Sequence, residues 1–190
     1  SMSNNKNNGF KSSPVMMSRR ALSAFLDAYD AHVAERATLA DGIGVAPKPL
    51  DAAQCQTLID EIKSFSGSEA EGQRLVEILS TRVPPGVDEA AYVKAAYLSA
   101  VANGEESSEL ISRSLAIELL GTMQGGYNVD TLVKRLEDPV SEIANLAADQ
   151  LKHTLLVFDA FYDVEELCKK AVPAAKAVME SWADAEWFTS

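Results

Sequence analysis

The sequence predicts an all-α protein of about eight or nine helices, because apolar residues recur at three- and four-residue spacing through most of the chain. Glycine, proline and serine clusters interrupt this pattern at short intervals, and no run of alternating apolar and polar residues between turns demands a strand. With 190 residues, 47% of them hydrophobic, the chain can bury one substantial core. We therefore expect a single folded domain.

Most of the expected helices have a start or stop signal. Asp51 and Asp88 can each cap the helix that follows, because a carboxylate oxygen accepts a hydrogen bond from an unpaired amide of the first turn. Pro84-Pro85-Gly86 stops a helix, since proline lacks the amide donor and clashes with the preceding turn. In order, helices are expected from Ser18 to near Ala40, from 51 to the turn at 66–68, from there to 84, from 88 to 103, from Ser112 or Ser114 into the glycines at 125–126, and over 129–136, 140–161, 164–171 and 174–187.

The start of the sequence differs in composition from the rest. It is rich in serine and asparagine, it carries Lys6 and Lys11, and no acidic residue occurs before Asp27. We expect a disordered basic leader over 1–17 and a single helical domain over 18–190. Ser1 before Met2 resembles a residue left after removal of an expression tag. The leader is open to two interpretations, a plain tail or part of an organellar targeting sequence, and it lacks the apolar core of a secretory signal.

The charge balance argues against two classes of partner. The formal net charge is -11, whereas nucleic acids and anionic membrane surfaces bind proteins through a basic face. No stretch of the sequence approaches the roughly 18 consecutive apolar residues of a membrane-spanning helix. We therefore expect neither a nucleic-acid partner nor a membrane partner.

The sequence offers no set of residues that could carry catalysis. Its two cysteines, Cys55 and Cys168, and its two histidines, His32 and His153, do not have the spacing of metal ligands or of a CxxC motif. A four-iron cluster site normally needs three or four cysteine thiolates, which this chain cannot supply. We expect two free thiols in a reducing compartment, with no catalytic residue, metal ligand or cofactor in this segment.

The segment Gly121-Thr-Met-Gln-Gly-Gly-Tyr-Asn128 is a glycine-rich, uncharged turn between two helices. One interpretation is structural: a glycine takes a positive backbone dihedral, the tyrosine packs back, and the asparagine caps the next helix. The other is functional: the polar side chains face an adjoining domain or a substrate channel, and glycine permits close backbone approach. The sequence leaves both open. The candidate interaction residues are Gln124, Gly125, Gly126, Tyr127 and Asn128.

Three large aromatic residues stand near the end of the sequence, at Trp182, Trp187 and Phe188. They form a second set of interaction candidates, because large aromatic side chains often anchor protein interfaces. Such side chains are equally common in cores, so composition alone does not decide between the two roles.

The segment from Leu132 to Leu151 has the style of a HEAT-type helix pair, in which two short amphipathic helices are joined by a tight polar turn. Such pairs stack, each burying its apolar face mainly against its neighbours and leaving an extended surface for a partner. We therefore expect a HEAT-like right-handed superhelix of antiparallel helix pairs.

Three segments together carry a resemblance to a known family. They are Arg82-Val-Pro-Pro-Gly-Val-Asp-Glu-Ala-Ala-Tyr-Val-Lys94, the turn from Gly121 to Asn128, and Ser181-Trp-Ala-Asp-Ala-Glu-Trp-Phe188. In this order they resemble the N-terminal region of the bacterial B-type aconitate hydratases, also described as bifunctional aconitate hydratase and 2-methylisocitrate dehydratase. The resemblance runs from about Leu26 to the last residue.

The resemblance implies a parent enzyme that converts citrate to isocitrate through cis-aconitate on a four-iron four-sulfur cluster. For this segment it implies protein–protein contact, with its own catalytic domains or another protein, dimer formation, and help in shaping a substrate channel. An alternative from a different class is a free-standing adaptor that keeps the helical module and binds a protein partner. RNA binding, a second role of aconitases, is weakened by the acidic balance. The compartment would be cytoplasmic in a bacterium, or an organellar matrix or stroma if the leader is a targeting sequence.

Overall fold

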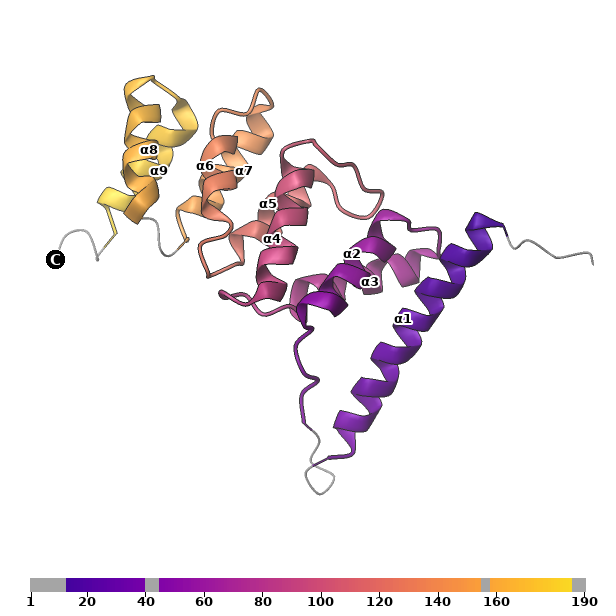
Figure 1. The fold of residues 1–190 in the computed structure, drawn as a ribbon. Helices are drawn as coiled ribbons and strands as arrows, with labels where there is room; N and C mark the ends of the chain where they lie inside the picture. The colour runs from indigo at the N-terminus through magenta and orange to yellow at the C-terminus, as the bar shows by residue number, and fades with distance from the viewer. Residues whose placement is uncertain (1–12, 40–44, 155–157, 186–190) are drawn as a thin grey trace, which may run out of the picture.

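The computed structural model describes residues 13–39, 45–154 and 158–185, and within them the chain is helical with no strand, which confirms the all-α prediction (Figure 1). None of the helices in these residues combines the length and the apolarity needed to cross a membrane. The helices are α1 (Pro14–Ala37), α2 (Ala52–Lys63), α3 (Glu69–Thr81), α4 (Glu89–Ala102), α5 (Arg113–Gly121), α6 (Val129–Arg135), α7 (Ser141–Leu151), α8 (Phe158–Lys169) and α9 (Pro173–Ala183).

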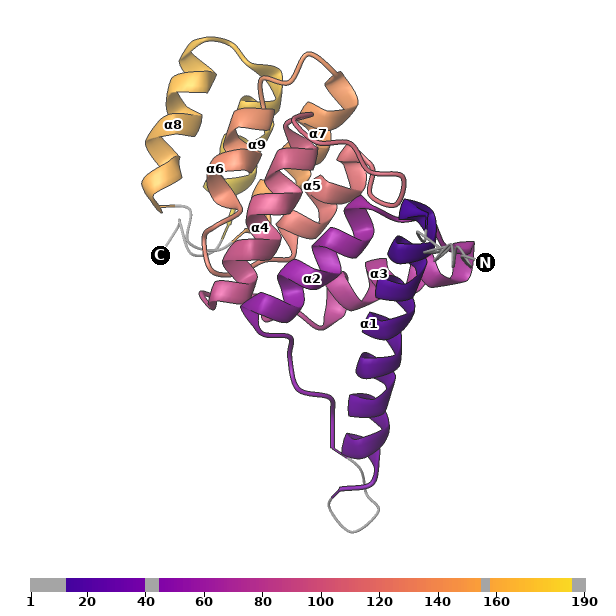
Figure 2. The ribbon, with the colours of Figure 1, turned by 45° about the vertical axis from the view of Figure 1, so that its right-hand side comes forward.

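From α2 onward the helices form four consecutive pairs arranged in two layers (Figures 1 and 2). The first helices of the pairs pack in series, α2 on α4, α4 on α6 and α6 on α8. In the other layer α5 packs on α7 and α7 on α9. Each pair buries its apolar face against the pairs beside it, as in helical-repeat proteins. The arrangement is consistent with a HEAT-like stack, and the right-handed superhelix stays a prediction.

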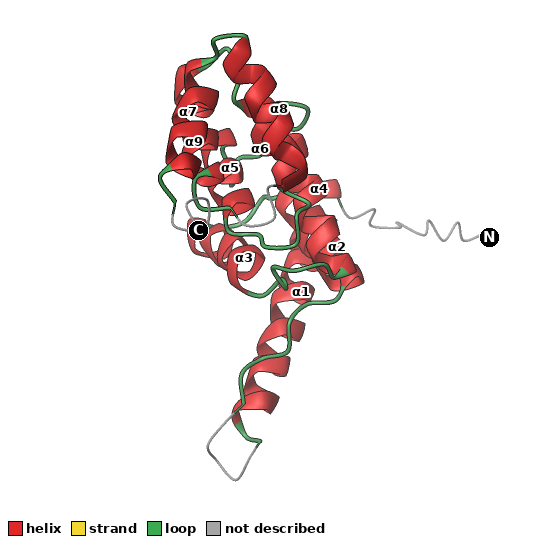
Figure 3. Cartoon of the chain, turned by 90° about the vertical axis from the view of Figure 1, so that its left-hand side faces the viewer, coloured by secondary structure: helices red, strands yellow, loops and turns green. Residues whose placement is uncertain are grey.

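Helix α1 lies apart from this stack. Only Leu22 and Leu26 of its 24 residues are buried, and its far end projects away from the body beside the returning segment 45–50 (Figure 3). The near end is held by the Ser18 hydroxyl, which donates to the Ser64 carbonyl at 3.0 Å. A bidentate ion pair joins Arg74 of α3 to Asp30 of α1. The helix is therefore anchored at one end and along one edge.

The start of α1 corrects the boundary expected from the sequence. Residues 14–17 were placed in a disordered leader, whereas they form the first turn of α1. The reason is local: the Ser13 hydroxyl accepts a bond from the Met16 amide, and Pro14 occupies a first-turn position where its missing amide costs nothing. The rest of the leader, residues 1–12, lies outside the described residues.

The expected long helix over 140–161 is wrong, because the chain divides it between α7, which ends at Leu151, and α8, which begins at Phe158. The His153 amide bonds to the Gln150 carbonyl at 3.2 Å, and the Thr154 hydroxyl donates to the same carbonyl at 2.7 Å. These contacts tighten and close the last turn of α7. Thr154 is itself buried. In the sequence, apolar residues continue directly after it, so the hydrophobic pattern does not mark the end of the helix.

The caps expected from the sequence are confirmed at α2 and α5 and not at α4. Asp51 caps α2 in a full capping box with Gln54, as expected, and Ser112 caps α5. Ser68 and Glu71 form a second capping box at α3. Asp88 stands at the N-cap of α4 but makes no side-chain cap bond, so its predicted capping role is wrong.

Candidate interaction site

The glycine-rich turn connects α5 to α6 and lies against the loop that precedes α4. The Gln124 amide donates to the Pro85 carbonyl at 2.7 Å. A Cβ atom on Gly125 would lie 2.0 Å from the Gly86 carbonyl oxygen, so only glycine permits this approach. Gly126 has a φ of +88°, as the structural interpretation required of one of the two glycines. The close approach is real, and its partner is the chain's own Pro84-Pro85-Gly86 loop.

Asn128 corrects both roles that the sequence gave it. Its side chain is completely buried, and its amide nitrogen donates to the carbonyls of Leu120 at 2.7 Å and Met123 at 3.3 Å. It stands at the N-cap of α6 but makes no cap bond to that helix. The side-chain amide therefore adds a second donor to the Leu120 carbonyl of α5, which also accepts from the Met123 amide, and it bonds the Met123 carbonyl in the turn after α5. Asn128 closes the preceding helix and presents nothing to an adjoining domain.

Tyr127 is the residue of the turn whose aromatic ring is exposed to solvent. Its hydroxyl donates to the Val87 carbonyl at 3.1 Å, and its ring stands edge-on to Tyr92 with centroids 5.4 Å apart. The exposed fractions are 39% for Tyr127, 59% for Tyr92 and 71% for Val87. We call these three residues the tyrosine ridge. Gln124 is also exposed.

Tyr92 was not among the interaction candidates taken from the sequence, and it lies exposed on α4. The buried stripe of α4 follows Ala91, Ala95, Leu98 and Ala102, at spacings of three and four residues. Tyr92 is one residue away from this stripe and therefore points about 100° from it. Ala96, four residues further along the helix, is exposed on the same side as Tyr92.

Two of the three segments that carried the family resemblance meet in space at this ridge. The segment 82–94 supplies the loop carbonyls and Tyr92, and the segment 121–128 supplies the amide, the glycine and the hydroxyl that contact them. Glycine occurs in both, at Gly86 and Gly125, because the two backbones touch there.

Trp182 is buried in the core, which corrects its assignment as an interface candidate. Its exposed fraction is 1%, and its ring stacks on Phe161 with centroids 6.3 Å apart. The indole nitrogen donates to the Leu151 carbonyl at 3.0 Å, at the C-terminal end of α7. The ring thus fills the space between α7, α8 and α9, while its polar edge satisfies a helix end. Trp187 and Phe188 lie outside the described residues.

A hollow of about 560 Å³ opens beside the tyrosine ridge, between α6 and α8. Buried Val129, Val133 and Ala160 line it with apolar surface. Its rim carries exposed carboxylates from both helices, and Gly125, Gly126 and Tyr127 complete the edge nearest the ridge. The turn predicted to matter therefore borders a concave surface.

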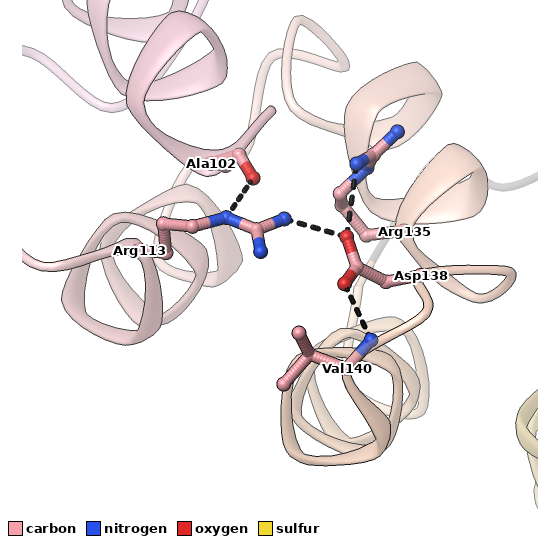
Figure 4. A network of polar contacts seen from close by, with 5 residues as sticks. All are labelled: Ala102, Arg113, Arg135, Asp138 and Val140. Carbon is pink, nitrogen blue, oxygen red and sulfur yellow. Dashed lines mark hydrogen bonds and ion pairs between the residues drawn. The ribbon is translucent and has the colours of Figure 1, made fainter. Parts of the chain in front are cut away.

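A buried carboxylate binds the middle pairs of the stack together (Figure 4). Asp138, in the turn between α6 and α7, accepts from Arg113 at 2.5 Å and from Arg135 at 2.9 Å, and its other oxygen accepts from the Val140 amide at 3.0 Å. Arg113 also donates to the Ala102 carbonyl at 2.9 Å. Burial acts to raise the pKa of Asp138, but the bonds from Arg113 and Val140 and the two guanidinium charges outweigh it, so the pKa lies below 3.8. The network is structural: it joins four helices.

Two further ionisable groups lie in the core between α2 and α4. Burial raises the pKa of the Cys55 thiol to about 11, so it stays protonated at neutral pH. Lys94 is 2% exposed, and desolvation lowers the pKa of its ammonium group. Outside this core, His32 of α1 accepts a hydrogen bond from the Lys48 amide at 3.1 Å.

The stacked helix pairs define an all-α domain, which carries an exposed aromatic ridge beside a hollow. No group of three or more His, Cys, Asp or Glu side chains in the described residues is placed to hold a metal ion. The chain belongs to the family described as the aconitate B N-terminal domain, whose model matches residues 28–188.

Curated relatives share this assignment. The chain is 56% identical over 163 residues to an aconitate hydratase B of Pseudomonas aeruginosa and 55% identical over 163 residues to one of Escherichia coli. It is 40% identical over 164 residues to one of Helicobacter pylori. Each match covers 86% of this chain and 18% of the relative. The chain thus corresponds to one part of much longer proteins.

The described residues do not fit an iron–sulfur cluster. Cys55 is buried in α2 and Cys168 lies half-buried in α8, and both are free thiols on separate pairs of the stack. Cluster sites draw several thiolates together around one cavity, and burial raises the pKa of both thiols. No step of cluster chemistry can be assigned to these residues.

Proposed function

We propose that this chain serves as the non-catalytic helical domain of an aconitate hydratase B and that its work is protein–protein contact. The observation that carries the proposal is the match itself, which extends over 28–188 of this chain but over only 18% of each relative. In this proposal the parent enzyme converts citrate to isocitrate through cis-aconitate, and its four-iron four-sulfur cluster is held elsewhere. The domain binds the catalytic part, supports dimer formation and helps to shape the substrate channel.

The arrangement of the site supports a contact role. The glycine turn and the loop before α4 hold each other rigidly, so the tyrosine ridge is presented on fixed backbone. Rigid aromatic side chains give contact area at low cost in conformational entropy, which favours binding. The Arg113–Asp138–Arg135 network joins α4, α5 and α6 at the ends opposite to the tyrosine ridge.

Reconstitution in trans tests the proposal. The catalytic part of the Escherichia coli relative, lacking the segment that matches this chain, is mixed with the full 190-residue chain and the molar mass is measured by light scattering. We expect a stable complex and a gain in aconitate hydratase activity over the catalytic part alone. The proposal is overturned if the two proteins remain separate species in light scattering, even at concentrations more than about 100 times those of the activity assay. Self-association without any such complex would support only the dimerisation part of the proposal.

A matched control separates docking from general stabilisation. The double variant Tyr92→Ala/Tyr127→Ala removes both rings of the ridge, and the double variant Tyr162→Ala/Val140→Ala removes two exposed apolar side chains elsewhere. If the ridge is the contact, the first variant weakens the complex and the second does not. Equal effects would place the contact on another face.

A further inference from the structure

The tyrosine ridge stands between two hollows on the layer formed by α2, α4, α6 and α8. Tyr92 lines a smaller one of about 280 Å³ between α2 and α4, and Tyr127 lines the larger one between α6 and α8. Both rings are edge-to-face and more than a third exposed. A contiguous exposed apolar patch with a polar rim is typical of an interaction surface, and tyrosine is enriched in such surfaces.

The charged side chains that line the larger hollow are all acidic. Its floor is apolar, while Asp130, Asp159 and Asp163 supply exposed carboxylates at its rim. Asp130 pairs with Lys134 at 2.8 Å. Asp159 and Asp163 have no ion-pair partner among the described residues. The hollow therefore combines an aromatic edge, an apolar floor and two carboxylates that form no ion pair within the described part of the chain.

We propose that this surface docks an arginine-bearing segment of a partner protein, with the guanidinium facing Asp159 and Asp163 and its stem lying along Tyr127 and the apolar floor. Charge complementarity selects the occupant, since the chain carries a net charge of -11 and the charged side chains that line this hollow are all carboxylates. Arginine fits better than lysine because its planar fork binds carboxylates with two bonds and also stacks on aromatic faces. The inference rests on the proposed function, since it specifies the chemistry of the partner.

A second copy of this chain is the weaker occupant. A two-fold symmetric contact places the same patch on both subunits, so the acidic rim of one copy would face the acidic rim of the other. Like charges in a contact oppose association. A partner segment with positive charge meets no such penalty.

The test uses the full 190-residue chain labelled with ¹⁵N and a short peptide, acetyl-Gly-Ala-Arg-Ala-Gly-amide. Its counterpart with citrulline in place of arginine keeps the shape and loses the charge. We expect the arginine peptide to shift the amide resonances of Gly125, Gly126, Tyr127, Asp159 and Asp163, and the citrulline peptide to shift them far less. Asp159→Asn/Asp163→Asn should weaken binding about tenfold, because it removes both carboxylate partners of the guanidinium.

A charge-matched control decides whether the effect is local. Glu69→Gln/Glu77→Gln changes the net charge by the same amount on exposed positions of α3, and it should leave the affinity within about twofold. Equal weakening by both pairs, equal binding of the citrulline peptide, or shifts on another face would each overturn the inference. Shifts of this face that grow with protein concentration in the absence of peptide would also overturn it, in favour of a second copy.

The outcome is separable from that of the proposed function. If Asp159→Asn/Asp163→Asn assembles with the catalytic part as well as the unsubstituted chain does, the proposed function stands and this inference falls. If the peptide binds here but the catalytic part does not, this inference is supported and the proposed function falls.

Discussion

The glycine turn at 121–128 and the connection between α7 and α8 are both joints between successive helix pairs, and the same device closes each one. At the first joint Asn128 donates to the carbonyls of Leu120 in α5 and of Met123 just after it, and at the second Trp182 donates to the last carbonyl of α7. Both residues looked like interface candidates in the sequence. The comparison shows that a buried polar tip at such a joint belongs to the fold, and that the surface available for contact is the exposed ring beside it.

The largest effect should come from the second joint. Trp182→Ala should lower the free energy of unfolding by about 4 kcal/mol, because it empties a large fully buried site. Trp182→Phe keeps a ring against Phe161 but loses the indole donor, so it should cost about 2 kcal/mol. Urea denaturation followed by circular dichroism measures both. A Trp182→Phe protein as stable as the unsubstituted chain would show that the Leu151 carbonyl needs no cap.

The turn within the third pair offers a comparison with the joints. Asp138→Asn should lower the free energy of unfolding at pH 7 by about 3 kcal/mol, because it leaves two guanidinium groups around a neutral side chain. Asp149→Asn loses the ion pair between its own largely exposed carboxylate and Lys152, and it should cost less than about 0.5 kcal/mol. Chemical denaturation of the two variants side by side tests the difference.

The same carboxylate predicts an acid dependence of stability. The folded-state pKa of Asp138 is lowered, so its contribution is complete above the ordinary value of 3.8 and is lost as the pH falls from there through the folded-state pKa. In Asp138→Asn this part of the acid dependence should be absent. Denaturation midpoints measured from pH 6 down to pH 2 report it, and parallel curves for the two proteins would contradict the assignment.

Substitution at the first joint should lower the free energy of unfolding less than substitution at the other two sites. Asn128→Ala removes the bonds to the Leu120 and Met123 carbonyls and should cost about 2 kcal/mol, since each of these two buried residues loses one donor. Asn145, which is exposed on α7, provides the control, and Asn145→Ala should be neutral or slightly stabilising because alanine favours helix. Equal destabilisation by both would remove the distinction between joint and surface.

The smallest effect should come from the ridge itself. Tyr92→Ala should cost no more than about 1 kcal/mol, the value of an exposed edge-to-face ring pair. Tyr127→Phe, which loses only the bond to the Val87 carbonyl, should cost about 0.5 kcal/mol. Thermal unfolding of both variants measures this. A loss of several kcal/mol would make the ridge part of the core rather than a contact surface.

Much of the fold was predictable because its signals are local. The helix starts at Asp51 and Ser112, the stop before Pro84 and the positive dihedral at the glycine pair each depend on a few neighbouring residues. The break between α7 and α8 was not predictable. Apolar residues continue through it in the sequence, and one of the contacts at the end of α7 comes from Trp182, 31 residues further along the chain.

The candidate site was predictable in place but not in detail. The sequence pointed to the glycine turn, yet it could not show that the close backbone approach is made to Gly86. It also could not show which side chain of the turn is buried, since Asn128 and Tyr127 are adjacent and face opposite environments. The acidic rim of the hollow was missed because Asp130 and Asp159 come from helices that meet only in the folded chain.

The Arg113–Asp138–Arg135 network has a consequence for how the chain unfolds. Because Arg113 belongs to the second helix pair and Asp138 to the third, the two pairs share one charged contact and cannot separate without breaking it (Figure 4). In a linear repeat array, cooperativity depends on such nearest-neighbour couplings. The middle of the array should therefore open as one unit, with amide hydrogens that exchange together and last, while the arm formed by α1 opens independently and earlier.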